Sequence, residues 1–289
     1  MAVGLALASA AVFALGTVLQ QREAMEDPDA KSGSVGVLLR LARRPVWLAG
    51  VTAYGVAFGL QAAALGVGRL VVVQPILATT IVFALPLGVR FSRQRVTRRD
   101  VVAASVVTVG LGLFLVLSDP GGGRDDAPIS QWVVAGGAVT AAVVALTVGG
   151  LAREGALRAA LLGTAAGLLF GLVSALTKGA IEVLQDDGFG VLANWHLYAL
   201  SVAGLAGMTL TQLSLGTGAL APAVATSSIF NPALSVLLGL TLFDEAIHED
   251  ALVSAAAALA LVAMFAGVAA LAAGSRGGEG AQQPSGEGA

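Results

Sequence analysis

Hydrophobic residues collect into long runs that are separated by short polar segments. Each run is about 20 residues long, which is what an α-helix with a rise of 1.5 Å per residue needs to cross a ~30 Å hydrocarbon core. The pattern therefore predicts an all-α, polytopic membrane bundle of about nine transmembrane helices. The runs cover residues 2–21, 46–67, 70–90, 100–118, 131–151, 157–183, 195–217, 219–243 and 250–273.

Three segments affect the number of spans. The first run precedes the first basic residue, Arg22, whereas a cleaved signal peptide starts with positive charge, so we expect a retained helix. Residues 33–43 are apolar but short and are interrupted by Arg40, which favours an interfacial helix. If they cross the membrane, the bundle has ten spans and the N-terminus lies on the opposite side. Residues 274–289 contain almost no apolar side chains and are predicted to form a disordered tail.

Composition supports a membrane protein. Only 12% of the residues are charged and 56% are hydrophobic, whereas a soluble domain carries about 25% charged residues. The chain has no cysteine, which excludes disulfides and cysteine metal sites, and its net charge of -2 argues against nucleic-acid binding. No metal motif, nucleotide-binding loop or catalytic triad occurs. We therefore expect a protein that is not an enzyme and needs no cofactor, with a lipid bilayer as its partner.

Basic residues predict the orientation. With nine spans, one side holds thirteen Lys and Arg residues, in the connections 22–45, 90–99 and 152–158 and in the tail, while the other holds only Arg69 and Arg124. Basic loops stay in the cytoplasm. The N-terminus is thus expected outside and the C-terminus in the cytoplasm, in a bacterial plasma (inner) membrane.

The two halves of the chain resemble each other weakly. Residues 65–70 match residues 215–220, and residues 13–20 match residues 170–177. These matches predict a first transmembrane repeat, a linker with an intervening helix, an inverted second repeat and a cytoplasmic tail. Their bounds are 1–118, 119–156, 157–273 and 274–289. Inverted repeats are typical of alternating-access carriers.

A competing register pairs residues 10–15 with residues 141–146 and would make a five-plus-five repeat. The sequence leaves both registers open. Small residues are frequent in either case, and Gly163, Gly167 and Gly171 recur at every fourth position of one predicted helix. This spacing predicts close packing against a neighbouring helix.

Prolines fall in corresponding spans of the two halves. A proline removes a backbone donor and frees a carbonyl, which membrane proteins tolerate where it lines a cavity or packs on protein. Interrupted helices in equivalent positions indicate a substrate site, although simple kinking is the alternative. The predicted helix breaks are at Pro75, Pro86, Pro222 and Pro232.

Polar side chains within the spans are the candidates for substrate binding. Each could instead bind a neighbouring helix through a hydrogen bond. Asn231, Gln74, Gln61 and Gln212 are expected to orient a substrate, and Tyr54, Thr79, Ser227 and Ser228 are further candidates.

Lys178 is the only charge well inside a predicted span. An intramembrane charge suggests a functional site, here one that neutralises an anionic group. The alternatives are structural pairing or a side chain that reaches up to the interface, because Lys178 lies near the end of its span. No Asp or Glu lies deep in a span, and Glu245 is among those at span ends. We see no carboxylate relay for protons and expect no metal site.

The order of these segments resembles the drug/metabolite transporter superfamily, in its EamA-like and NIPA-type magnesium transporter branch. The resemblance covers roughly residues 2–272, and Phe243-Asp244-Glu245 is similar to an acidic motif of EamA-like members. It implies two inverted repeats around a central cavity and secondary transport of a small-molecule or ion substrate. Magnesium is one implied substrate, yet Lys178 would repel a cation.

Our sequence-based hypothesis is a secondary, alternating-access transporter of a small solute or metabolite. A magnesium transporter, a lipid flippase-like carrier and a membrane-embedded structural or accessory protein without transport activity are the alternatives. Homodimer formation is left open. A water-filled cavity would favour the carrier and a cavity-free bundle the structural protein.

Overall fold

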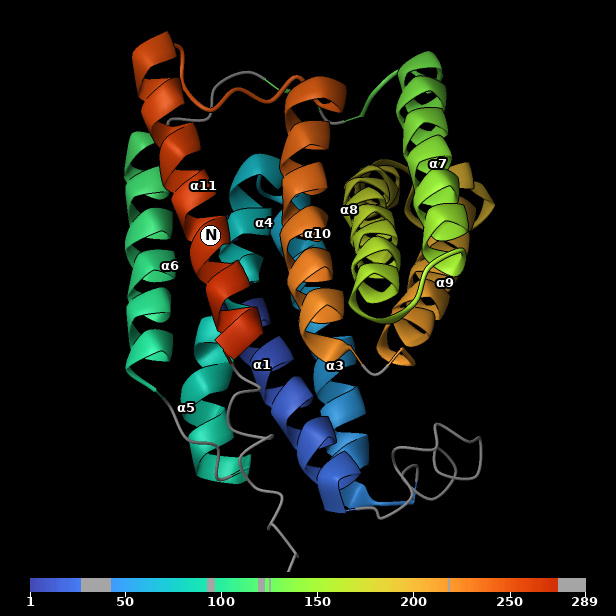
Figure 1. The fold of residues 1–289 in the computed structure, drawn as a ribbon. Helices are drawn as coiled ribbons and strands as arrows, with labels where there is room; N and C mark the ends of the chain where they lie inside the picture. Colours follow the sequence, from blue (N-terminus) through green and yellow to red (C-terminus); the bar gives the residue numbers. More distant parts are fainter. Residues whose placement is uncertain (27–42, 93–96, 119–122, 125, 218, 275–289) are drawn as a thin grey trace, which may run out of the picture.

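The helices form one bundle in which the chain runs up and down between two ends (Figure 1). The computed structural model describes residues 1–26, 43–92, 97–118, 123–124, 126–217 and 219–274. Its helices are α1 (Ala2–Glu26), α3 (Pro45–Gly66), α4 (Leu70–Ala78), α5 (Thr80–Ser92), α6 (Arg98–Leu117), α7 (Ile129–Leu151), α8 (Gly155–Asp187), the 3-10 helix η2 (Gly188–Ala193), α9 (Trp195–Leu215), α10 (Leu220–Leu242) and α11 (Ala251–Gly274).

Nine spans within the described residues are long and apolar enough to cross a membrane, which confirms the predicted polytopic all-α bundle. The predicted bounds agree with the helices to within a few residues. Two predictions, the interfacial helix at residues 33–43 and the tail beyond residue 274, lie outside the described part of the chain or at its margin.

The third span is interrupted. Its first part, α4, ends at Ala78, and its second part, α5, begins at Thr80. The hydroxyl groups of Thr79 and Thr80 donate to the carbonyl oxygens of Ile76 and Leu77, and these bonds satisfy carbonyls at the end of α4. The break therefore leaves a short half-helix, α4, inside the bundle.

Sequence signals explain several helix ends. Thr97 caps α6 with a reciprocal box, because its hydroxyl accepts from the Asp100 N–H while its own N–H donates to the Asp100 carboxylate. Asn194 caps α9 by accepting the N–H of His196. The residue that caps α4 is not a neighbour in the sequence and belongs to the candidate site.

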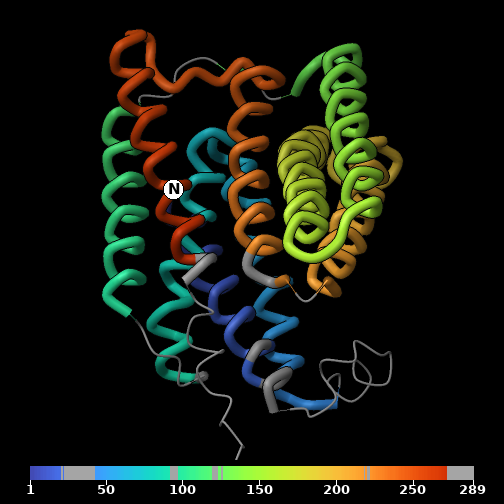
Figure 2. The backbone as a smooth tube through the Cα atoms, viewed as in Figure 1, coloured from blue at the N-terminus to red at the C-terminus, as the bar shows by residue number. Residues whose placement is uncertain are grey.

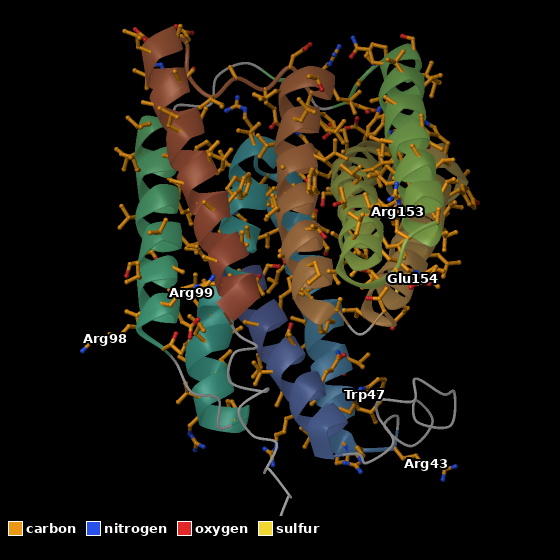
Figure 3. All side chains as sticks on the ribbon, in the orientation of Figure 1. Arg43, Trp47, Arg98, Arg99, Arg153 and Glu154 are labelled. Atoms are coloured by element: carbon orange, nitrogen blue, oxygen red, sulfur yellow. The ribbon has the colours of Figure 1, made fainter. Side chains whose placement is uncertain are left out.

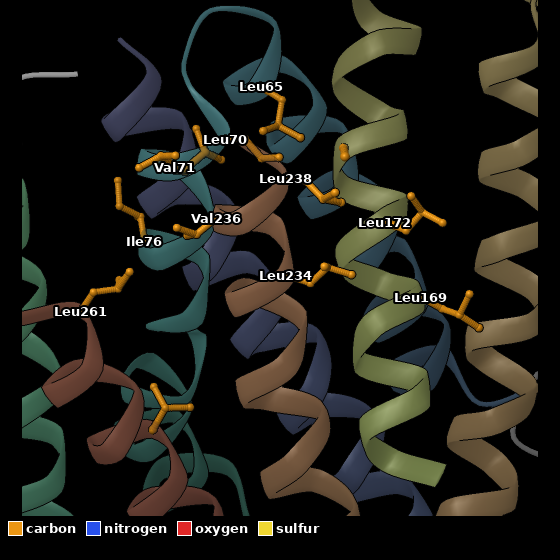
Figure 4. Packing of buried hydrophobic residues seen from close by; sticks show 14 of the residues in the cluster. Leu65, Leu70, Val71, Ile76, Leu169, Leu172, Leu234, Val236, Leu238 and Leu261 are labelled. Atoms are coloured by element: carbon orange, nitrogen blue, oxygen red, sulfur yellow. The ribbon is translucent and has the colours of Figure 1, made fainter. Parts of the chain in front are cut away.

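The core forms where α4, α8 and α10 meet. Leu70, Val71 and Ile76 of α4 lie beside Val236 of α10, and Leu234 extends from α10 toward α8 (Figure 4). Glycines bring α8 close to α10: a Cβ added to Gly163, Gly167 or Gly171 would meet the backbone oxygens of Ala223, Ser227 and Asn231. The predicted close packing of this glycine face is confirmed.

The chain's path places its connections at two ends. The tube in Figure 2 shows the connection from α10 to α11 at the upper end, while α5 passes to α6 at the lower end. Figure 3 labels Arg98 and Arg99 at the lower end of α6.

Candidate functional site

A buried carboxylate stands at the end of α10. The chain reverses there, because the Phe243 N–H donates to the Leu238 carbonyl oxygen and the Glu245 N–H donates to that of Gly239. Asp244 supports the reversal with a left-handed φ of 50°. A Cβ on Gly239 would lie 2.7 Å from Glu245 Oε2, so glycine leaves the space that the carboxylate needs.

Glu245 caps the half-helix α4. Its Oε1 accepts the N–H of Leu70 at 2.9 Å and its Oε2 accepts the N–H of Val71 at 2.8 Å. The first turn of a helix has unsatisfied N–H groups and partial positive charge, so a carboxylate is favoured there. Arg69, which precedes the helix, gives α4 no side-chain cap. The distant Glu245 takes that role.

Lys178 of α8 completes the arrangement. Its Nζ lies 2.5 Å from Glu245 Oε1 and 4.4 Å from the centre of the Phe243 ring. The Glu245 side chain is fully buried and that of Lys178 is 11% exposed. Lys178 is thus paired with a buried carboxylate inside the bundle. The pair joins α8, the N-terminus of α4 and the segment after α10.

Two glutamines and one asparagine among the predicted polar residues lie within the bundle. Gln61 of α3 and Gln74 of α4 are buried, and Asn231 of α10 is half-buried. Gln74 Nε2 and Asn231 Oδ1 are buried atoms with no hydrogen-bond partner. Buried polar atoms are nearly always paired in native proteins, so these two indicate a missing partner.

The other polar candidates lie elsewhere or are already satisfied. Gln212 is exposed on α9, so the structure does not bring it together with the buried residues. The Tyr54 hydroxyl is 2.9 Å from that of Thr17 and joins α3 to α1, as the helix–helix alternative predicts. Thr79 donates to its own helix. Ser227 and Ser228 are half-buried on α10, where Ser227 faces Gly167.

The prolines of the two halves differ in their effect on the helices that contain them. Pro75 lies in α4 and Pro86 in α5, on either side of the interruption. In the other half α10 is continuous: Pro232 lies inside it, and Pro222 stands in its first turn, where a missing N–H breaks no helical bond. The matched interruption that we expected in both halves therefore occurs in the first half alone.

A second polar cluster surrounds the connection between α6 and α7. Arg124 forms an ion pair with Asp244 at 3.1 Å and also donates to Gln131. The indole N–H of Trp132 donates to Asp126 Oδ1 at 2.9 Å. Arg124 thereby holds the connection between α10 and α11, which carries both Asp244 and Glu245. The Lys178–Glu245 pair and the cluster around Arg124 therefore meet at this connection.

Comparison with known proteins gives a family. No family model matches the sequence, and no solved structure matches it. An uncharacterized protein of Corynebacterium glutamicum is 34% identical over 249 residues, which are 85% of each chain. The chain belongs to the same family as this corynebacterial protein.

No function is established by this family membership, because the relative is described only as uncharacterized. Among the residues that the structure describes, no group of three or more His, Asp or Glu side chains converges as metal ligands would.

Asp126 should make stability depend on pH at acid values. Partial burial raises the pKa of the Asp126 carboxyl. Three neighbours that favour the charged form outweigh this effect, namely His196, the Trp132 indole and the Ala127 N–H, and His196 Nε2 lies 3.5 Å from Asp126 Oδ1. The pKa of Asp126 is therefore below the ordinary 3.8. A carboxylate with a depressed pKa stabilises the fold above its unfolded value, and this contribution is lost as the pH falls through the folded value.

We therefore expect unfolding of the purified protein in detergent to become easier below about pH 4. Asp126→Ala should be less stable at neutral pH by about 1 kcal/mol and should lose the part of the acid dependence that Asp126 supplies. Tryptophan fluorescence during denaturation measures both effects. Equal acid dependence in the parent and the variant would contradict the assignment.

Sequence reasoning missed the partner of Lys178. It placed Glu245 at a span end, and its only signal there was the similarity of Phe243-Asp244-Glu245 to the acidic motif of EamA-like members. The structure also buries the ring of His196 between Trp132 and Trp195, which the sequence did not indicate. Neither contact could be found from local spacing.

Proposed function

We propose that the protein is a secondary transporter of a small solute or metabolite in a bacterial plasma membrane, working by alternating access. The observation that carries the proposal is the half-helix α4, which carries the buried, unpaired Nε2 of Gln74 and packs on α10, where Asn231 Oδ1 is likewise buried and unpaired. Interrupted helices with free polar groups are the usual substrate sites of such carriers.

Helix packing supports the inverted four-plus-four repeat on which the proposal rests. α1 packs on α3 as α8 packs on α9, and α6 packs on α11. A Cβ on Gly110 would meet Ala260 and Met264, while one on Gly267 would meet Ala103 and Val107. The two sets of contacts are related by a constant difference in residue number, because Gly110, Ala103 and Val107 correspond to Gly267, Ala260 and Met264. The same difference separates Phe13 from Phe170.

Lys178 and Glu245 have a defined part in this proposal. Their pair ties α8, the N-terminus of α4 and the segment after α10 together, so in this proposal it closes one side of the carrier. Opening toward that side requires the pair to separate or to move as one body. The resemblance to drug/metabolite transporters agrees with such a carrier, and the corynebacterial relative agrees with a bacterial membrane.

Magnesium is the weaker alternative substrate. Glu245 is already neutralised by Lys178 and by two backbone N–H groups, so its carboxylate is not free to bind a divalent cation. The remaining oxygens near the break come from amides and carbonyls. The free amide donor of Gln74 and the free amide acceptor of Asn231 suit a neutral solute that offers both an acceptor and a donor.

The test begins with thermal unfolding in detergent in the presence of magnesium chloride, dicarboxylates and neutral amino acids. A compound that raises the unfolding temperature is then used as the labelled probe in proteoliposomes. Asn231→Ala should lower its uptake by about threefold to tenfold, as expected for one lost hydrogen bond. Thr209→Val is the matched control, because Thr209 is exposed on α9 and donates to its own helix.

Uptake by Asn231→Ala equal to that of the parent would contradict the site. No stabilising compound and no uptake would favour the non-transporting structural protein. Thermal unfolding of each variant without solute separates lost binding from lost folding.

A further inference from the structure

A hollow lies on the outside of the bundle, between α6 and α11. It has a volume of about 470 Å³, and Arg98 and Arg99 stand at one end of it. The rest of its lining is apolar, with Val102 and Val106 from α6 and Ala266 and Ala270 from α11. The hollow is thus an apolar groove with positive charge at a single end.

Small residues create the groove. A Cβ on Gly267 would lie 2.8 Å from Val107 Cγ2 and 3.0 Å from the Ala103 carbonyl oxygen, so α6 and α11 touch there through their backbones. Beside this contact, Ala266 and Ala270 are too short to fill the space next to Val102, which is 63% exposed. In a membrane-spanning bundle this face is open to lipid.

The two arginines are available to a ligand. Both are exposed in the first turn of α6, and no other described side chain forms an ion pair with them. The acidic residue of the same turn, Asp100, is buried, and its Oδ2 accepts the N–H and the hydroxyl of Thr97 in the capping box. Asp100 therefore does not neutralise the arginines at the surface.

The position of the charges selects the ligand. Arg98 and Arg99 lie at the lower end of α6, where the span begins (Figure 3). Arginine side chains at span ends reach the headgroup level, and basic pockets between transmembrane helices bind anionic headgroups. An apolar groove that begins at such a pair and runs along the span matches an acyl chain that continues from a phosphate.

We propose that this groove binds one anionic phospholipid. Its phosphate lies against the guanidinium groups of Arg98 and Arg99, and one acyl chain runs along Val102, Val106, Ala266 and Ala270. The site is separate from the polar residues of the transport proposal, because it lies on the outer face of α6 and α11. The bound lipid covers the α6–α11 contact and stabilises it by mass action.

Native mass spectrometry of the full chain tests the proposal. The delipidated protein is mixed with phosphatidylglycerol or with phosphatidylcholine of the same acyl chains. The parent should hold one phosphatidylglycerol in preference. Arg98→Gln with Arg99→Gln should weaken that binding by about thirtyfold, which corresponds to roughly 1 kcal/mol for each of the two basic residues near an anionic lipid.

Two further variants distinguish the contribution of the lipid headgroup from that of the acyl chain and from a general effect of surface charge. Arg153→Gln removes an exposed charge beside α7, well apart from α6 in Figure 3, and should leave phosphatidylglycerol binding unchanged. Ala266→Trp fills the groove and should weaken the binding of both lipids. Thermal unfolding without added lipid checks that each variant is folded.

Four results would overturn the proposal. Binding that survives the loss of both arginines would remove the phosphate site. An equal loss in Arg153→Gln would mean a general surface charge effect. Displacement of the lipid by inorganic phosphate at a similar concentration, or a dimer mass that Ala266→Trp abolishes, would assign the groove to a free anion or to a second copy of the chain.

Discussion

Replacing Glu245 with alanine should lower the free energy of unfolding by about 3–5 kcal/mol, the usual cost of breaking a buried ion pair from one side. The Glu245 side chain has no exposed surface, and three donors converge on it, namely Lys178 Nζ and the N–H groups of Leu70 and Val71. Its removal leaves a buried ammonium group and an uncapped helix.

Lys178→Met should cost less, by about 2 kcal/mol, and this asymmetry is the sharper part of the prediction. Without Lys178, the Glu245 carboxylate keeps both backbone N–H groups and the positive end of α4. Methionine fills the space of the aliphatic stem and removes the charge. The double variant should resemble Glu245→Ala or be more stable, because no unpaired ammonium group remains.

Equilibrium unfolding in mixed detergent micelles measures all four proteins, and the double-mutant cycle gives the coupling between the two side chains. Asp250→Ala is a suitable control, because Asp250 is an exposed carboxylate that caps the neighbouring helix α11 through the N–H groups of Leu252 and Val253. It should cost only about 1 kcal/mol. An equal effect of Glu245→Ala and Lys178→Met would show that the cap of α4 contributes little.

Span positions could be predicted from the sequence because lipid imposes length and apolarity on every crossing segment. The helix of residues 131–151 is one example, since the structure begins it at Ile129 and ends it at Leu151. The glycine face of α8 was equally readable, because a spacing of four residues puts Gly163, Gly167 and Gly171 on one side of a helix.

The inward face of each helix could not be predicted in the same way. Gln212 was expected in the site, yet it is exposed on α9. In a soluble protein an apolar stripe marks the buried side, but in a membrane both lipid and protein interior are apolar, so the stripe disappears. Polarity alone then says that a residue needs a partner and does not say where the partner is.

The depth of Glu245 was hidden for a different reason. Its distance from the end of α10 along the chain suggests an exposed loop, but the reversal at Phe243 and Asp244 turns it back into the bundle. Its partners Leu70 and Lys178 are remote in sequence. Only a three-dimensional arrangement of α4, α8 and α10 brings these groups together.

The second large effect is expected at the glycine face of α8. Gly163→Ala should destabilise the protein by about 2–3 kcal/mol, the upper part of the range for overpacking a close contact. Its Cβ would lie 2.5 Å from both the Ala223 carbonyl oxygen and Thr226 Oγ1. Because one of these is a backbone atom, relief requires α10 to move away from α8, and this weakens the packing of Leu234.

Gly167→Ala should cost somewhat less, about 1–2 kcal/mol, since its Cβ would be 2.9 Å from the Ser227 carbonyl oxygen. The two substitutions together should cost less than their sum, because α10 needs to be displaced only once. Gly136→Ala on α7 is the matched control. No atom lies within 4 Å of its Cβ, so alanine should leave stability unchanged or raise it by up to about 1 kcal/mol through its higher helix propensity.

The same unfolding measurement in mixed micelles decides the matter, with the Gly136→Ala control run beside each α8 variant. If the effects of Gly163→Ala and Gly167→Ala add strictly, α10 adjusts locally at each contact. If Gly163→Ala is as stable as the parent, the two helices are not in backbone contact. Either result would also weaken the transport proposal, because Asn231 is held beside α8 by this packing and its carbonyl oxygen faces Gly171.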